Sequence, residues 1–126
     1  MGELIEIFER RIYRRFPAKE RAFVYLGSEL GDMLYHLIEI SGGGLSFRYL
    51  GEEVLTKNLS KLSLVMEDDF YVAALPVETV SDIRLVNSYI PFRRKSVRFC
   101  ELSPRSKSQL FDFIINNTEK YTILLI

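Results

Sequence analysis

Hydrophobic and polar residues follow two different patterns along this chain. Over residues 3–16, apolar side chains recur every three to four positions, which is the spacing of one face of a helix. Pro17 ends this pattern because the residue before a proline is disfavoured in the helical region. From Ala22 onward the chain shows short apolar runs separated by turn residues, which are typical of β-strands. The pattern therefore predicts an N-terminal helix followed by a β domain.

Six or seven short strands are predicted in this β domain. Leu59–Met66 has a period of two, and Phe70–Ile83 forms a long strand with an expected bend at Pro76, which lacks a backbone donor. The basic run Arg93–Lys95 is interpreted as a solvated loop. The other predicted strands cover residues 22–26, 33–40, 45–50, 84–89 and 96–102. Short strands with tight turns and flanking helices predict a mainly β fold, a small antiparallel barrel.

A second helix is predicted near the C-terminus. Ser103 and Pro104 are typical of the N-cap and the first helical position. Apolar residues at positions 110, 113 and 114 supply one face of this helix, and Asn116–Asn117 end it. The tail at 121–126 is apolar and β-prone, and its role stays open.

Length and charge narrow the class of protein. The 126 residues predict one domain with one hydrophobic core. Seventeen basic and seventeen acidic residues give a net charge of zero, which argues against a general nucleic-acid-binding protein. The sequence contains no signal-peptide pattern and no apolar run as long as a membrane span. We therefore expect a cytoplasmic protein without membrane insertion.

Residues suited to catalysis are few. Cys100 is the single cysteine and His36 the single histidine, and both fall in predicted strands. We interpret Cys100 as a half-buried, inert thiol and His36 as a structural histidine. No nucleophile and base are recognisable as a pair, and no set of cysteines and histidines has the spacing of a metal site. The sequence predicts that the chain is not an enzyme and needs no metal or cofactor.

A glycine-rich turn is the first candidate for ligand binding. Ser41 precedes three consecutive glycines, Gly42–Gly44, between two predicted strands. Glycines permit positive φ and allow a ligand to approach the backbone amides closely. Glu39 adds a carboxylate that can accept hydrogen bonds from a guanine edge. Taken by itself, the same segment is also compatible with a plain reversal of the chain.

An arginine-rich segment, Arg10–Arg15, is the second candidate. Guanidinium groups bind phosphate through two hydrogen bonds and stack on flat bases, so such a cluster suits a nucleotide. The alternative interpretation is a solvated helix face that is balanced by the glutamates at positions 3, 6, 9 and 20.

The order and spacing of these two features resemble the PilZ domain. That family carries an Arg-x-x-x-Arg segment before its barrel and Asp/Asn-x-Ser-x-x-Gly at the end of the second strand. Residues 39–44, Glu-Ile-Ser-Gly-Gly-Gly, are similar to the second motif. The stretch Ser96–Pro104 followed by an amphipathic helix is also similar to the end of such domains. The resemblance covers about residues 11–117.

The resemblance implies a six-stranded antiparallel β-barrel that binds the bacterial second messenger cyclic di-GMP. In such domains the arginines hold phosphates and guanine, and the turn meets a guanine. Ser41 and Gly44 match the serine and the last glycine of the motif, and Glu39 stands where Asp or Asn is expected. Ligand binding would reorganise the N-terminal segment and alter a surface for a protein partner, as in control of motility or exopolysaccharide.

The register of the arginines stays open. Aligning Arg14 with the first motif arginine gives the best spacing but places Ala18 at the second, with Lys19 as a weaker substitute. The pairs Arg10/Arg14 and Arg11/Arg15 keep both arginines but begin a few residues earlier. The ligand-binding residues we expect are Arg11, Arg14, Arg15, Glu39, Ser41 and Gly44.

The expected organisation has three parts. Residues 1–20 form a helical, arginine-rich segment, residues 21–117 the barrel with its C-terminal helix, and residues 118–126 the apolar tail. An alternative function is that of a PilZ-like adaptor that does not bind cyclic di-GMP. Such an adaptor would act through a protein partner or as a homodimer, using its N-terminal apolar stripe or its last strand.

Overall fold

The computed structural model describes residues 16–19, 21–27, 32–51, 59–66, 69–85 and 89–117. The predicted N-terminal helix lies outside these residues, except that its last residue, Phe16, belongs to a strand. The tail after Asn117 also lies outside them. Within the described residues, the one helix is too short and too polar to span a membrane.

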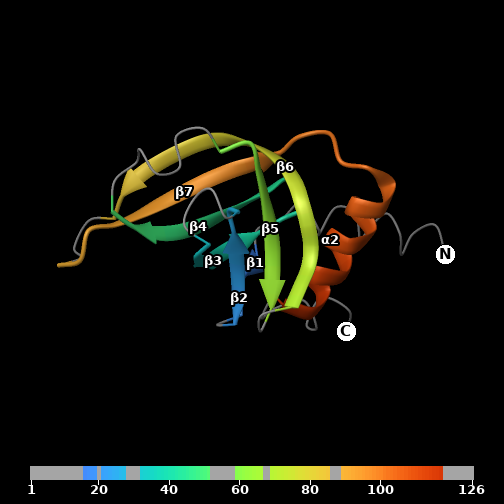
Figure 1. Cartoon of the computed structure of the whole chain (residues 1–126), viewed down its shortest axis with the longest axis horizontal. Coiled ribbons are helices and arrows are strands. Elements are labelled where there is room, and N and C mark those ends of the chain that lie inside the picture. Colours follow the sequence, from blue (N-terminus) through green and yellow to red (C-terminus); the bar gives the residue numbers. More distant parts are fainter. Residues whose placement is uncertain are drawn as a thin grey trace.

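Six antiparallel strands form a closed barrel (Figure 1). The ring runs in the order β3, β2, β5, β6, β7 and β4, and it closes because β4 also pairs with β3. A two-residue strand, β1 (Phe16–Pro17), adds to β3 beside the ring. The six ring strands are β2 (Ala22–Tyr25), β3 (Leu34–Ile40), β4 (Gly44–Leu50), β5 (Lys61–Met66), β6 (Asp69–Arg84) and β7 (Phe92–Phe99). The predicted six-stranded barrel is thus confirmed.

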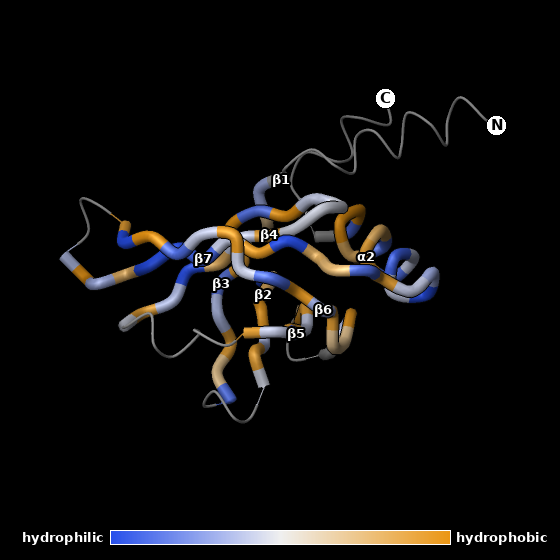
Figure 2. The backbone as a smooth tube through the Cα atoms, turned by 90° about the horizontal axis from the view of Figure 1, so that it is seen from above, coloured by the Kyte–Doolittle hydropathy of each residue, from blue (hydrophilic) through white to orange (hydrophobic). Residues whose placement is uncertain are grey.

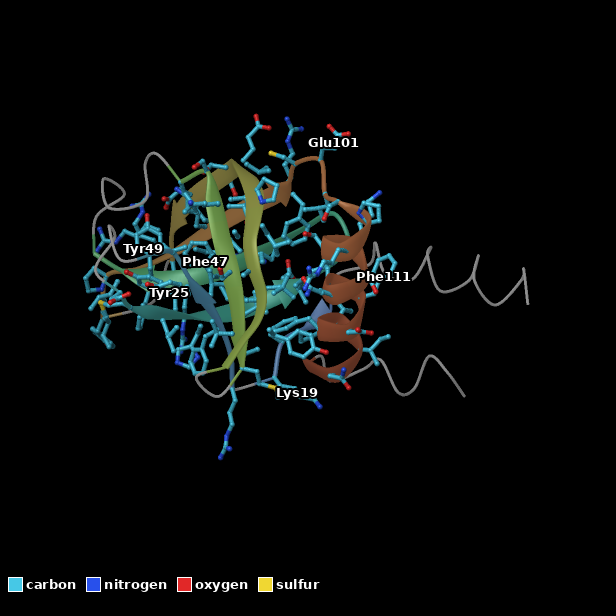
Figure 3. The ribbon with its side chains drawn as sticks, turned by 45° about the vertical axis from the view of Figure 1, so that its right-hand side comes forward. Lys19, Tyr25, Phe47, Tyr49, Glu101 and Phe111 are labelled. Atoms are coloured by element: carbon cyan, nitrogen blue, oxygen red, sulfur yellow. The ribbon has the colours of Figure 1, made fainter. Side chains whose placement is uncertain are left out.

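Alternate residues of the strands fill the barrel. On β4, Phe47 and Tyr49 point inward and are almost fully buried, with their ring centroids 6.2 Å apart (Figure 3). Figure 2 shows hydrophobic and hydrophilic residues following one another along the strands, as expected where one face is buried. Each such buried side chain contributes about 1.5–3 kcal/mol relative to an exposed one. Further core residues come from the other ring strands: Val24, Leu37, Ile40, Leu62, Leu64, Val72, Leu75 and Val97.

The helix α2 (Pro104–Asn117) packs on β6 and adds its apolar face to the core. Phe113 is fully buried, and its ring lies 5.4 Å from that of Tyr71 on β6. Ser103 is the N-cap, since its Oγ accepts a hydrogen bond from the Ser106 amide at 3.1 Å. At the other end Lys19 Nζ donates to the Asn116 carbonyl at 3.0 Å, which joins the chain after β1 to the helix C-terminus (Figure 3).

The last two strands differ from the sequence prediction. β6 is one strand of 16 residues that continues to Arg84, so the separate strand predicted at 84–89 is wrong. β7 begins at Phe92, so Arg93–Lys95 lie in a strand and the predicted solvated loop is wrong. Four consecutive polar residues, Arg93–Ser96, hid the start of this strand, because they interrupt the alternation of apolar and polar residues and lysine has low strand propensity. The ladder between β5 and β6 contains a β-bulge near Ala74, whose φ is 53°.

Candidate ligand-binding site

Ser41 builds the turn between β3 and β4. Its amide donates to the Gly44 carbonyl at 2.8 Å, and its Oγ accepts from the amides of Gly43 and Gly44 at 3.1 and 3.2 Å. The side chain is buried in the turn. The hydroxyl therefore fixes the shape of the loop by replacing backbone hydrogen bonds, as serine does in local turn motifs.

Gly44 is required for a close approach of strands. A Cβ atom at this position would lie 2.3 Å from the Val97 carbonyl oxygen on β7, a distance that real Cβ atoms do not show. Gly44 lies opposite Arg98 in the β4–β7 ladder, and the Phe99 amide donates to the Gly43 carbonyl at 2.9 Å. Among the glycines described, positive φ occurs at positions 27 and 51 and not in this turn. The glycine is thus explained by strand packing rather than by positive φ.

A pocket of about 250 Å³ lies over this turn, and we call it the turn pocket. It brings together Glu39, Ser41 and Gly44, which are the predicted site residues that the structure describes. The neighbouring strands β4, β6 and β7 supply its other walls. The remaining lining residues are Ile40, Gly43, Leu45, Ser46, Val80, Ser96, Val97 and Arg98.

Glu39 is held by an arginine that the sequence did not suggest. Arg94 Nη2 on β7 lies 2.6 Å from Glu39 Oε1 on β3, and the same nitrogen donates to Ser46 Oγ at 3.0 Å. Both charged side chains are partly buried, with 30% and 24% of their surface exposed. Because 55 residues separate the pair, only the pairing of β3, β4 and β7 reveals it.

The strand β1 leads the chain to the edge of the turn pocket. Phe16 lies opposite Ile40 and Pro17 opposite Glu39, and the Ala18 amide donates to the Ile38 carbonyl at 2.9 Å. The predicted site residues Arg11, Arg14 and Arg15 lie outside the described residues. In the sequence, Arg15 directly precedes Phe16, the first residue of β1.

A second pocket of about 410 Å³ lies next to β1, and we call it the basic pocket. Three of its lining side chains are cationic, and they come from the chain after β1 and from β4 and β7. Its lining residues are Ala18, Lys19, His36, Leu37, Ile38, Arg48, Leu85 and Arg94.

A buried polar cluster lies inside the barrel beneath these strands. Asp82 on β6 accepts hydrogen bonds from Tyr49 and from Arg93 Nε, the latter at 2.8 Å, and lies 3.4 Å from Lys95 Nζ. Burial raises the pKa of Asp82, but the hydrogen bonds from Tyr49 and Arg93 and the charges of Lys95 and Arg93 outweigh it, so the pKa is lowered overall. The negative charge of Asp82 and the positive charges of Arg93 and Lys95 compensate one another. The cluster therefore stabilises the fold.

The single histidine and the single cysteine lie apart from the turn pocket. His36 is exposed on β3, with its ring 5.0 Å from that of Phe23, and it lines the basic pocket. Cys100 is exposed and follows the end of β7, so the prediction of a half-buried strand residue is wrong. Among the described residues, no three His, Cys, Asp or Glu side chains are grouped so that they can hold a metal ion.

The closed barrel, the pocket over its serine–glycine turn and the adjoining cationic residues define a small β-barrel domain with a candidate ligand-binding site. The sequence agrees with this class, because residues 9–116 match the PilZ domain family. The chain belongs to the PilZ domain family. The family suggested by the sequence motifs is thus confirmed. No curated protein sequence matches the chain.

Solved structures support the fold. MrkH of K. pneumonia in complex with c-di-GMP superimposes with a TM-score of 0.65 at 12% identity, over 82% of this chain and 50% of that one. The PilZ domain of Escherichia coli YcgR with c-di-GMP gives 0.57 at 17% identity, over 85% and 90%. Borreliella burgdorferi PlzA in complex with c-di-GMP gives 0.57 at 13% identity, over 90% and 55%. The chain spans about half the length of MrkH and PlzA.

Proposed function

We propose that this chain is an effector domain that binds cyclic di-GMP. The observation that carries the proposal is the pairing of β1 with β3, which sets Pro17 opposite Glu39, a lining residue of the turn pocket. The arginine segment directly precedes β1 in the sequence. Three structural relatives, MrkH, YcgR and PlzA, were solved with c-di-GMP bound. A carboxylate acceptor in the pocket, together with guanidinium groups from the segment that precedes β1, would suit a guanine nucleotide.

Each site residue has a distinct role in this proposal. Arg11, Arg14 and Arg15 hold the phosphates and stack on guanine. The Glu39 carboxylate accepts hydrogen bonds from the guanine edge, which presents N–H donors. Ser41 and Gly44 act indirectly, because they shape the turn and allow β7 to pack beside it.

The proposed signalling depends on the arginine segment, which directly precedes β1 in the sequence. When its guanidinium groups close over the nucleotide, residues 1–20 change their arrangement relative to the barrel of residues 21–117, which alters the surface offered to a protein partner. Motility or exopolysaccharide synthesis is the kind of process that such a partner controls. Because cyclic di-GMP is an intracellular messenger, the proposed site of action is the cytoplasm. The role contains no catalytic step and no cofactor.

Titration calorimetry with cyclic di-GMP tests the proposal. The unaltered chain should release heat with a 1:1 or 2:1 ligand ratio, and the double variant Arg14→Ala/Arg15→Ala should lose this signal. Arg105→Ala is a matched control, since Arg105 is exposed on α2 and lines neither pocket. Absence of both a heat signal and a thermal shift in the unaltered chain would refute the proposal.

A PilZ-like adaptor without a ligand is the second candidate. It is favoured by the observation that strand packing and local hydrogen bonds already account for Gly44 and Ser41. Large apolar side chains are also exposed around the β6–β7 connection, including Tyr89 and Ile90. An adaptor predicts a homodimer or a protein complex that persists in the Arg14→Ala/Arg15→Ala variant and does not respond to cyclic di-GMP. Light scattering with and without the nucleotide separates the two candidates.

A further inference from the structure

The described lining of the basic pocket contains positive charges that no carboxylate of the same lining balances. Lys19, Arg48 and Arg94 line it, and no carboxylate is among its described lining residues. Ile38 and Leu85 provide apolar surface in the same pocket. A cationic rim around apolar surface suits a ligand that is anionic at one point and flat and apolar at another.

Two of these cations are cross-strand neighbours on the adjacent strands β4 and β7. Arg48 on β4 lies directly opposite Arg94 on β7. Like charges at directly opposite positions of an antiparallel pair destabilise the sheet. Arg94 is balanced by Glu39, whereas the guanidinium carbon of Arg48 lies 5.0 Å from the centre of the Phe92 ring. An anion bound between the two arginines would relieve their repulsion.

Both guanidinium groups retain donors for such an anion. The hydrogen bonds of Arg94 to Glu39 and Ser46 both come from Nη2, so Nε and Nη1 donate to no group among the described residues. Stacking of Arg48 on Phe92 positions the planar group through its face and leaves the N–H edges available. A planar fork of N–H donors matches the oxygen atoms of a phosphate.

The basic pocket continues the turn pocket along the same two strands. Ser46 and Ser96, which are opposite each other, line the turn pocket, and Arg48 and Arg94 follow two residues further along. Two residues of a strand span about 7 Å. The ion pair of Glu39 and Arg94 lies at the boundary, because Glu39 lines the turn pocket and Arg94 the basic pocket.

Ala18 lines the basic pocket without contributing a charge. It is partly buried and packs against the core, while β4 and β7 bring two guanidinium groups to the same pocket. Lys19 adds a third positive charge, although its Nζ donates to the carbonyl of Asn116. Position 18 carries no positive charge, and Arg48 and Arg94, which are distant from it in the sequence, supply positive charge to the same pocket.

We propose that Arg48 and Arg94 form a phosphate-binding subsite, which binds a phosphoryl group of the nucleotide whose guanine occupies the turn pocket. This inference rests on the proposed function and extends it to two residues outside both sequence motifs. Arg94 has a double role, because it also holds the Glu39 carboxylate in position.

Calorimetric titration of Arg48→Gln with cyclic di-GMP is the decisive experiment, because Glu39 is held by Arg94 whereas Arg48 stacks on Phe92. We expect its affinity to fall about tenfold or more, which corresponds to one charge-assisted hydrogen bond. Arg94→Gln should lose at least as much, and Arg94→Lys should recover only part of it. Arg105→Gln removes the same charge from exposed α2 and should bind like the unaltered chain. Thermal unfolding of each variant verifies that it is folded.

The outcomes separate the subsite from the proposed function. If cyclic di-GMP binds and Arg48→Gln behaves like Arg105→Gln, the subsite is refuted while the proposed function stands. If the unaltered chain does not bind cyclic di-GMP, the proposed function fails and inorganic pyrophosphate becomes the probe. Shifts of the Arg48 and Arg94 side-chain Nε–Hε signals in NMR spectra would then support a phosphate site. Unchanged signals at millimolar pyrophosphate would refute it.

Discussion

Arg94 on β7 and Glu39 on β3 form an ion pair of 2.6 Å across the outer face of β4. The pair joins two strands that are not direct neighbours, and it lies where the turn pocket meets the basic pocket. Ser46, between them on β4, accepts a hydrogen bond from the same arginine nitrogen at 3.0 Å. The carboxylate at the predicted guanine position is therefore fixed in the protein before any ligand arrives.

A double-mutant cycle of Glu39→Gln and Arg94→Gln should show a coupling free energy of about 0.5–1 kcal/mol without ligand, since the pair is partly buried. Urea denaturation of the four proteins measures it. The pair Glu78 and Arg98 is a matched control, because its charged atoms are similarly close at 2.7 Å but its side chains are 57% and 64% exposed. Its coupling should not be measurable. Equal coupling in both pairs would contradict the importance of burial.

Gly44→Ala should lower the free energy of unfolding by about 2–3 kcal/mol, because the added Cβ meets the backbone carbonyl of Val97 and no side-chain rotation can relieve the overlap. Urea denaturation measures the loss, and hydrogen exchange of the Phe99 amide, which bonds to Gly43, should become faster. Gly27→Ala is the comparison. The space around Gly27 is open and its φ is 107°, so any strain there should leave exchange at Phe99 unchanged.

Asp82→Asn should lower the free energy of unfolding by about 3 kcal/mol at neutral pH, because it removes the charge that compensates buried Lys95. The pKa of Asp82 is lower in the folded chain than its ordinary 3.8, so its charge stabilises the fold above that pH. This contribution is lost as the pH falls below about 4 and the carboxylate takes up a proton. The unaltered chain and the variant should therefore approach each other in stability between pH 5 and about 2.

Unfolding curves at a series of pH values test this expectation. Asp112→Asn is the control, since Asp112 is exposed on α2. Its stability should run parallel to that of the unaltered chain over the same range. A constant difference between Asp82→Asn and the unaltered chain at all pH values would contradict the proposed role of the charge.

Ser103→Ala should lower stability by about 1 kcal/mol, because the Ser106 amide loses the N-cap oxygen that accepts its hydrogen bond. The loss should appear in the unfolding of the whole domain, since α2 carries buried Phe113 into the core. Ser108→Ala tests the same chemical change at an exposed position within the helix, where alanine has the higher helix propensity. Thermal unfolding should show no loss for Ser108→Ala.

The local pattern of the sequence determined the class of fold. Alternation over Leu59–Met66 and short apolar runs elsewhere predicted the strands, and Ser103 with Pro104 predicted the start of α2. These signals are readable because strand periodicity and helix capping depend on residues that are close in sequence. The arginine segment followed by the Ser41–Gly44 turn also identified the PilZ family.

Tertiary structure decided which residues share the site and what each does there. Arg93–Lys95 looked like a solvated loop, yet Lys95 is only 1% exposed because Asp82 on the neighbouring strand compensates its charge. Ser41 and Gly44 were predicted as ligand contacts, and their hydrogen bonds and packing give them structural roles. Such relationships depend on the register of strands that are distant in sequence, which no local pattern specifies. The pair of Glu39 and Arg94, 55 residues apart, exists only because the barrel closes.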